Sequence, residues 1–155
     1  MKYLLFILPF LFFGCSTKNY EQTKSKVIII KSPKLKFADL GYIRNTGKAI
    51  ELELFIAGQS VEKFTINHLI CARAGCLSKS GFNADYLHES YPDSILQNIL
   101  LARVIYEGVN QVQTGNGFTQ KIKNEHVDIT YKVSPHVTFF KDKKNKIIFK
   151  IKDIL

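Results

Sequence analysis

Apolar and polar residues alternate along several short stretches of this chain, and the alternation predicts a mainly β protein. In residues 49–66, polar side chains separate Ile50, Leu52 and Leu54, and the chain turns near Gly58. A period of two is typical of a strand with one buried face. Two such strands around a short glycine-containing turn predict a hairpin.

The last third of the chain shows the same alternation in four consecutive stretches. Short polar turns separate these stretches, as expected for an antiparallel meander. A further extended stretch is expected from residue 27 onward. The four predicted strands of the meander are residues 118–123, 127–133, 137–141 and 147–151.

One segment between these β regions has helical spacing. An apolar stripe begins at Ile95 and ends at Leu100, with a proline and an aspartate just before it. The pattern predicts a helix over residues 92–103, and a shorter helical turn over residues 80–87 capped by Asn83. The expected fold class is therefore mainly β (α+β), with a curved antiparallel sheet forming an incomplete β-barrel and the helix as its lid.

The first fifteen residues have the pattern of a bacterial lipoprotein signal peptide. Lys2 precedes an apolar run over residues 3–13, shorter than the about 20 residues of a membrane-spanning helix. Gly14 and Cys15 then supply the small residue and the thiol that cleavage and lipid attachment require. We expect Cys15 to carry the lipid; a non-lipidated export signal and an uncleaved anchor are the alternatives.

These features divide the chain into three parts. Residues 1–14 are expected to be the signal peptide, and residues 15–26 the acylated cysteine with a polar, flexible tether. Residues 27–155 are long enough to bury one core and are expected to form a single domain. The lipid would hold this domain at a membrane.

The chain is basic, with 22 lysines and arginines against 13 acids and a formal net charge of +9. An exported protein seldom meets nucleic acid, so no nucleic-acid partner is expected. Anionic lipid headgroups or an acidic protein are the expected counterparts. The alternative is a solvated, lysine-rich surface with no dedicated ligand.

Beyond Cys15 the chain has two cysteines, Cys71 and Cys76. A pair in an oxidising compartment predicts a disulfide, and so short a ring shapes a local turn rather than fastening a whole domain. A metal site is less favoured because only His68 lies near the pair and no second cysteine pair follows. The spacing also differs from the C-x-x-C of redox-active dithiols.

The sequence lacks the common motifs of catalysis. It contains no G-x-S-x-G, no H-E-x-x-H and no glycine-rich phosphate loop. The group of Asp85, His88 and Glu89 is the nearest approach to an acid-base or metal site, but acids there are more typical of a helix start. The sequence therefore predicts a protein that is not an enzyme and holds no metal or cofactor.

The predicted strands carry more large apolar side chains than one small helix covers. An incomplete barrel of this kind predicts an apolar cavity for an acyl chain; a fully packed core is the alternative. The residues expected to form the cavity are Leu52, Leu54, Phe64, Ile66, Ile95, Ile99, Ile129, Tyr131 and Phe149.

Two apolar residues beside the cysteine ring, Leu69 and Ile70, predict a second feature. At the tip of a projecting loop they would insert into the interfacial zone of a bilayer. The alternative is that they complete the preceding strand and point into the core.

Three segments resemble the LolA/LolB-like family of periplasmic lipoprotein carriers and outer-membrane lipoprotein receptors. They are the leucine-rich helix at 91–103, the strand at 127–131 and the closing strand at 147–154. The resemblance implies an open β-barrel with a helical lid, an acyl-chain cavity and an outer-membrane anchor facing the periplasm. It also implies a periplasmic carrier protein as a partner, and a membrane-inserting role for Leu69 or Ile70.

The expected function is accordingly that of an outer-membrane-anchored lipoprotein. It would bind the acyl chains of other lipoproteins, or another amphiphile, and help to insert them into the outer membrane. A non-enzymatic accessory or scaffold lipoprotein of a cell-envelope complex is the first alternative, and a surface adhesin is the second.

Overall fold

The computed structural model describes residues 22–154, and the expected signal peptide and Cys15 lie outside them. The described chain forms one antiparallel sheet in the order β6-β5-β4-β3-β2-β1-β11-β10-β9-β8-β7. The sheet stays open, because its edge strands β6 and β7 do not pair with each other. The strands are β1 (Gln22–Lys31), β2 (Lys36–Asn45), β3 (Ile50–Ile56), β4 (Gln59–Ile66), β5 (Ile70–Ala72), β6 (Gly75–Leu77), β7 (Gln111–Thr114), β8 (Gly117–Lys123), β9 (Asp128–Ser134), β10 (Val137–Asp142) and β11 (Ile147–Asp153).

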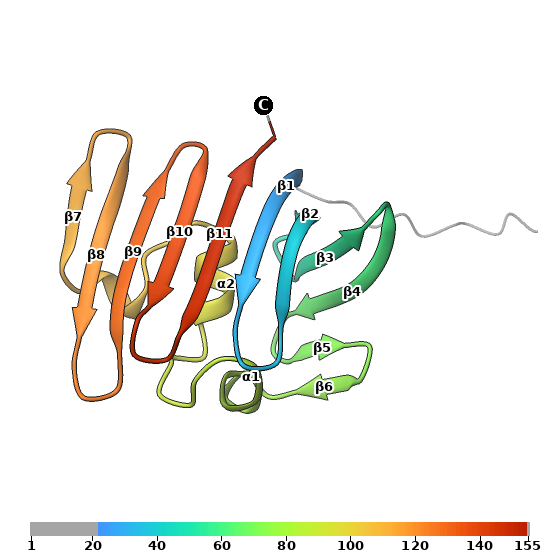
Figure 1. Cartoon of the computed structure of the whole chain (residues 1–155), viewed down its shortest axis with the longest axis horizontal. Helices are drawn as coiled ribbons and strands as arrows, with labels where there is room; N and C mark the ends of the chain where they lie inside the picture. Colours follow the sequence, from blue (N-terminus) through green and yellow to red (C-terminus); the bar gives the residue numbers. More distant parts are fainter. Residues whose placement is uncertain (1–21, 155) are drawn as a thin grey trace, which may run out of the picture.

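Two meanders, β1 to β6 and β7 to β11, meet in the middle of this sheet (Figure 1). The junction is the pairing of β1 with β11, where Ile28 lies opposite Ile151 and Ile30 opposite Phe149. Because these four side chains are buried, the first and the last described strands contribute to the same core.

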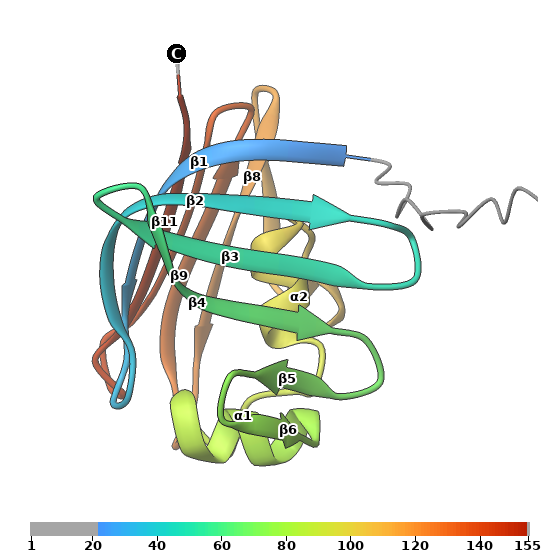
Figure 2. The same cartoon turned by 90° about the vertical axis from the view of Figure 1, so that its right-hand side faces the viewer.

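The helices connect the two meanders on the concave side of the sheet, and Figure 2 shows the sheet curving around α2. All members of the hydrophobic core lie between Ile28 and Ile151, so a chain that starts at Ser16 contains the whole described fold. No helix in the described range is long and apolar enough to cross a membrane. The helical elements are α1 (Lys79–Tyr86), α2 (Ile95–Leu100) and the 3₁₀ turn η1 (Tyr106–Gly108).

The predicted curved, mainly β sheet, its first hairpin and its C-terminal meander are confirmed. The expected tether is corrected, because residues 22–26 belong to β1. There, Gln22 pairs with Asn45 of β2 and Lys26 with Asp153 of β11. These residues are polar and give no apolar signal, but all five pair with β2, and Lys26 also pairs with β11.

The predicted helices are shorter or differently capped. The helix expected at 92–103 is only α2, because Ala102 adopts a left-handed backbone with φ of 54° and ends it. The side chain of Ser78, and not that of Asn83, caps α1 by accepting a hydrogen bond from Gly81 N–H at 3.0 Å. Asn83 is buried instead, and its amide donates to the carbonyl of Tyr91 at 3.1 Å.

Candidate functional site

The nine residues expected to form a cavity do come together, but they fill the space between them. Each is at most 2 % exposed, and all belong to one hydrophobic core. The void beside Leu52, Phe64 and Phe149 measures about 10 Å³, which is roughly the space that one water molecule needs. The described conformation therefore has the packed interior that the sequence left as the alternative.

Of the two residues expected at the tip of a membrane-inserting loop, Ile70 lies in a strand and Leu69 lies just before it. Ile70 begins β5, pairs with Ile66 and is 1 % exposed, so it points into the core and not toward a bilayer. Leu69 is half-buried. The disulfide between Cys71 and Cys76 is confirmed, and it joins directly opposite residues of β5 and β6.

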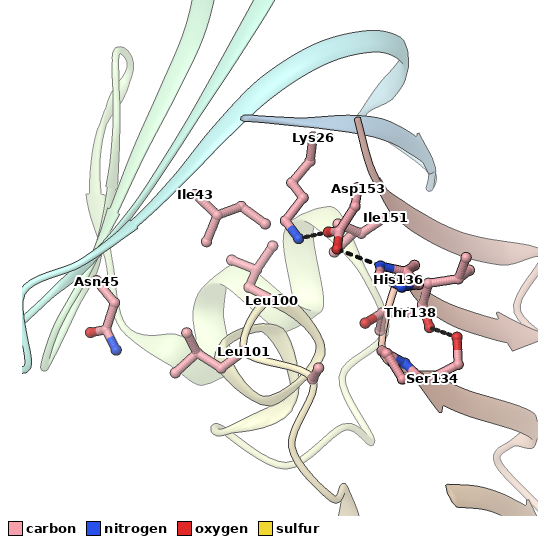
Figure 3. Close-up of a pocket in the computed structure, with 13 residues that line it drawn as sticks. Lys26, Ile43, Asn45, Leu100, Leu101, Ser134, His136, Thr138, Ile151 and Asp153 are labelled. Carbon is pink, nitrogen blue, oxygen red and sulfur yellow. Dashed lines mark hydrogen bonds and ion pairs between the residues drawn. The ribbon is translucent and has the colours of Figure 1, made fainter. Parts of the chain in front are cut away.

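Two adjoining pockets lie at one end of the sheet, above Leu100 and Leu101. The first has a volume of about 150 Å³, and Ile43 and Ile151 contribute to its apolar lining (Figure 3). The second has a volume of about 270 Å³. Asn45 and Leu101 line both, so we treat the two together as the mouth of the sheet.

One carboxylate in the first pocket is already paired. Asp153 accepts a hydrogen bond from the ammonium of Lys26 through Oδ1, and its Oδ2 lies 3.2 Å from His136 Nδ1. Figure 3 shows the three side chains on one wall of the pocket, with Leu100 and Leu101 across from them. The ion pair of Lys26 with Asp153 therefore balances the charge on this wall.

The second pocket has a different character. Its lining includes Lys48, Lys79 and Arg103 but, within the described chain, no acid; the amide side chains of Asn45, Asn67 and Gln97 complete its polar lining. Three cations without a balancing carboxylate produce a positive potential, and guanidinium and amide groups donate hydrogen bonds to carboxylates and phosphates. The arrangement is suited to an anionic group held above the apolar core.

Sequence reasoning missed this pocket. Its lining comes from the β2–β3 turn, the end of β4, the start of α1 and the end of α2. These segments are far apart along the chain, and each contributes a single basic residue or none. Only the fold brings them together.

A buried carboxylate, Asp142, holds the segment that precedes α2. Its Oδ2 accepts hydrogen bonds at 2.7 Å from the hydroxyl of Tyr91 and from the amide of Asn145. Burial raises the pKa of Asp142, but hydrogen bonds from Tyr91, the Asp128 N–H and Asn145 outweigh it, and the net pKa is lowered. Asp142 is therefore a charged anchor for the chain at the start of the helical cover.

A buried amide holds the segment that follows α2. Gln120 of β8 accepts a hydrogen bond from Ile105 N–H and donates to the carbonyl of Ile105, both at 2.9 Å, and donates to the carbonyl of Val109 at 2.8 Å. The hydroxyl of Tyr131 donates to the carbonyl of Arg103 at 2.9 Å. Both flanks of α2 are thus fastened to the sheet by buried polar groups.

The two tyrosines nearest Asp142 should respond differently to loss of their hydroxyls. Tyr91→Phe removes a hydrogen bond to a buried carboxylate and should lower the free energy of unfolding by about 1.5 to 3 kcal/mol. Tyr106 has a buried hydroxyl with no hydrogen-bond partner in the described chain, and burial raises its pKa to about 12. Tyr106→Phe should therefore leave stability unchanged or raise it. Urea unfolding measures both, and equal losses would contradict the assignment.

No grouping of three or more histidine, cysteine or acidic side chains suited to a metal ion occurs within residues 22–154. No family model, curated protein or solved structure matches the chain. The fold and the site therefore define its class: a mainly β domain with an open, curved sheet, a helical cover and a basic pocket at its mouth. The resemblance to the LolA/LolB-like family stays a prediction.

Proposed function

We propose that this protein is an outer-membrane-anchored lipoprotein that binds acyl chains of lipoproteins, or another amphiphile, and helps to insert them into the outer membrane. The anchor is the lipid on Cys15, and the domain faces the periplasm, where a carrier protein delivers the cargo. The sheet acts as an incomplete barrel, with the helices as its lid. The observation that carries the proposal is an apolar concave face that, in the described chain, is covered by two short helices, of eight and six residues, and the loops beside them.

An acyl chain requires the lid to move, because the interior void of about 10 Å³ is too small for hydrocarbon. Each methylene transferred from water contributes roughly 0.8 kcal/mol, so ten contribute roughly 8 kcal/mol. That is comparable to the free energy of breaking several buried hydrogen bonds of about 1 to 3 kcal/mol each. Binding can therefore offset release of the lid, and small differences in fit set the direction of transfer.

The mouth favours a particular kind of amphiphile. Lys48, Lys79 and Arg103 line the second pocket, close to Leu101 and the ends of the core strands. A hydrocarbon chain beneath the lid would leave its polar end at this position. We therefore expect an anionic group beside the acyl chain to strengthen binding.

The proposal is tested with the chain from Ser16 onward and two fluorescent probes, a long-chain fatty acid and its uncharged methyl ester. Both should bind. Ile99→Glu should abolish binding of both probes, because it places a charge in the core. Leu101→Glu should also abolish binding of both, and because Leu101 is only half-buried, this change preserves the fold more readily. The triple change of Lys48, Lys79 and Arg103 to Gln should weaken the acid about tenfold or more but leave the ester within about twofold.

Failure of the folded wild-type chain to bind either probe would overturn the proposal. Circular dichroism of each variant separates loss of binding from loss of fold. The control for the triple change is Lys34, Arg73 and Lys143 to Gln, which removes the same charge away from the mouth.

One observation favours a second function, that of an accessory or scaffold lipoprotein of a cell-envelope complex. The nine core residues leave almost no free volume in the described conformation, as expected for a domain that binds through its surface. Absence of probe binding together with a stoichiometric protein partner would support this alternative.

A further inference from the structure

The convex face of the sheet carries seven lysines in adjacent cross-strand rows. In the first row, Thr130 pairs with Lys121 on one side and with Lys141 on the other. Ile148 in turn pairs with Lys141 and with Lys31. The next row pairs Lys132 with Phe139, Phe139 with Lys150, and Lys150 with Ile29. We call this surface the lysine face; its cations are Lys31, Lys36, Lys121, Lys132, Lys141, Lys150 and Lys152.

These lysines point away from the lid. Their neighbours along the same strands, among them Ile28, Tyr131, Phe140 and Phe149, are buried in the core, and successive side chains of a strand lie on opposite faces. Figure 1 views the sheet from this side, with α2 behind β10 and β11. The lysine face and the mouth are therefore separate surfaces.

The charge of the lysine face is not balanced. The rows that contain the seven lysines hold no acid, and the nearest acid of the same face, Asp128, lies one row beyond Thr130. Within residues 25–154, none of the seven forms an ion pair. On β3 of the same sheet, by contrast, Glu51 and Glu53 bind Lys63 and Arg44.

The shape of the lysine face indicates what it binds. It extends over six neighbouring strands, β8, β9, β10, β11, β1 and β2, a width of roughly 24 Å at about 4.8 Å between strands. Its apolar side chains, such as Ile29, Phe139 and Ile148, are half-buried and separated by lysines. Protein interfaces are depleted in lysine at their centres, whereas a bilayer offers many anionic groups over a wide surface.

We propose that the lysine face docks on a bilayer of anionic phospholipids. Each lysine near such a surface strengthens attachment about fivefold, so several together hold the domain against the membrane without a specific headgroup pocket. The inference does not depend on an acyl-chain site, because the two surfaces lie on opposite sides of the sheet. Docking by this face leaves the lid free to open.

The test uses the chain from Ser16 onward, which lacks Cys15 and so has no lipid anchor. Sedimentation with phosphatidylcholine vesicles that contain about 30 % phosphatidylglycerol, whose anionic headgroups attract basic side chains, should show binding that weakens as salt rises. Vesicles of pure phosphatidylcholine should bind little. Changing Lys132, Lys141 and Lys150 to Gln should lower the affinity about 100-fold, whereas changing the same three to Arg should preserve it.

The control that removes an equal charge elsewhere is the pair Lys34 and Arg73 to Gln, compared with the pair Lys132 and Lys150 to Gln; the control should retain most of the binding. An equal loss in this control would mean that net charge alone drives attachment, and the lysine face would have no special role. Equal binding to both vesicle types, or none to either, would also overturn the proposal. Each outcome leaves the fatty-acid experiment to be read separately.

Discussion

Replacing Asp142 with asparagine should lower the free energy of unfolding by about 3 to 5 kcal/mol at pH 7. The buried carboxylate accepts five hydrogen bonds: from the hydroxyl of Tyr91, the amide of Asn145 and the backbone N–H groups of Asp128, Lys144 and Asn145. Asparagine has an NH₂ group in place of one carboxylate oxygen. This group cannot accept a hydrogen bond, so the donors that the lost oxygen served would be left unpaired. Removing one member of a buried, charged network has an effect of this size.

The same change should alter how stability depends on pH. The folded-state pKa of Asp142 is lowered from its ordinary value of 3.8, so its stabilising contribution is complete above that value and is lost as the pH falls through the folded-state pKa. Asp142→Asn should therefore flatten the acid limb of the stability curve. Glu53, whose pKa is lowered by a hydrogen bond from Arg44, leaves some acid sensitivity in both proteins.

Urea unfolding between pH 2 and 7 is the measurement, with the exposed Asp93 changed to asparagine as the control, which should shift stability by less than about 0.5 kcal/mol. If the Asp142 variant kept the wild-type acid limb, this carboxylate would not be the anchor that we describe. If it lost stability by less than the Asp93 control, the hydrogen-bond network would be unimportant.

The sequence pattern predicted the parts of the fold that depend on apolar alternation. Ile50, Leu52 and Leu54 point inward as expected, and so do Ile147, Phe149 and Ile151. Strands without that signal were missed, above all β7, whose side chains are all exposed, and the polar start of β1. These strands form because a neighbour offers backbone hydrogen bonds, which no local pattern reveals.

The candidate surfaces were harder to foresee than the core. Alternating lysines were visible in the last strand, at Lys150 and Lys152, but the sequence did not show that β11 pairs with β1 and so places Lys31 in the same face. Gln120 did leave a signal, because it is a polar residue at an inward-facing position of the strand predicted at 118–123. Asp142 left none, because the strand predicted at 137–141 ends before it, whereas β10 includes it.

The second large effect is expected from Gln120→Met, which keeps the volume of the side chain but removes its three hydrogen bonds. The N–H and carbonyl of Ile105 and the carbonyl of Val109 would lose their partner inside the protein. Each unpaired buried group has an unfavourable effect of about 1 to 3 kcal/mol, so the free energy of unfolding should fall by about 3 kcal/mol or more. The exposed Gln113, changed to Met on the neighbouring strand, should have almost no effect.

Gln120→Met also tests whether the lid has to move. Because Gln120 fastens the chain after α2, amide hydrogen exchange should quicken first in residues 101–110, before the central strands β1 and β11 are affected. The fatty-acid probe should then bind faster than it does to the wild-type chain, since a weaker fastening raises the population of open lids. Unchanged stability would contradict the role of Gln120. If the lid loosened but the rate of probe binding stayed the same, lid opening would not be required for binding. That result would favour the alternative of an accessory or scaffold lipoprotein, whose packed core only supports its binding surfaces.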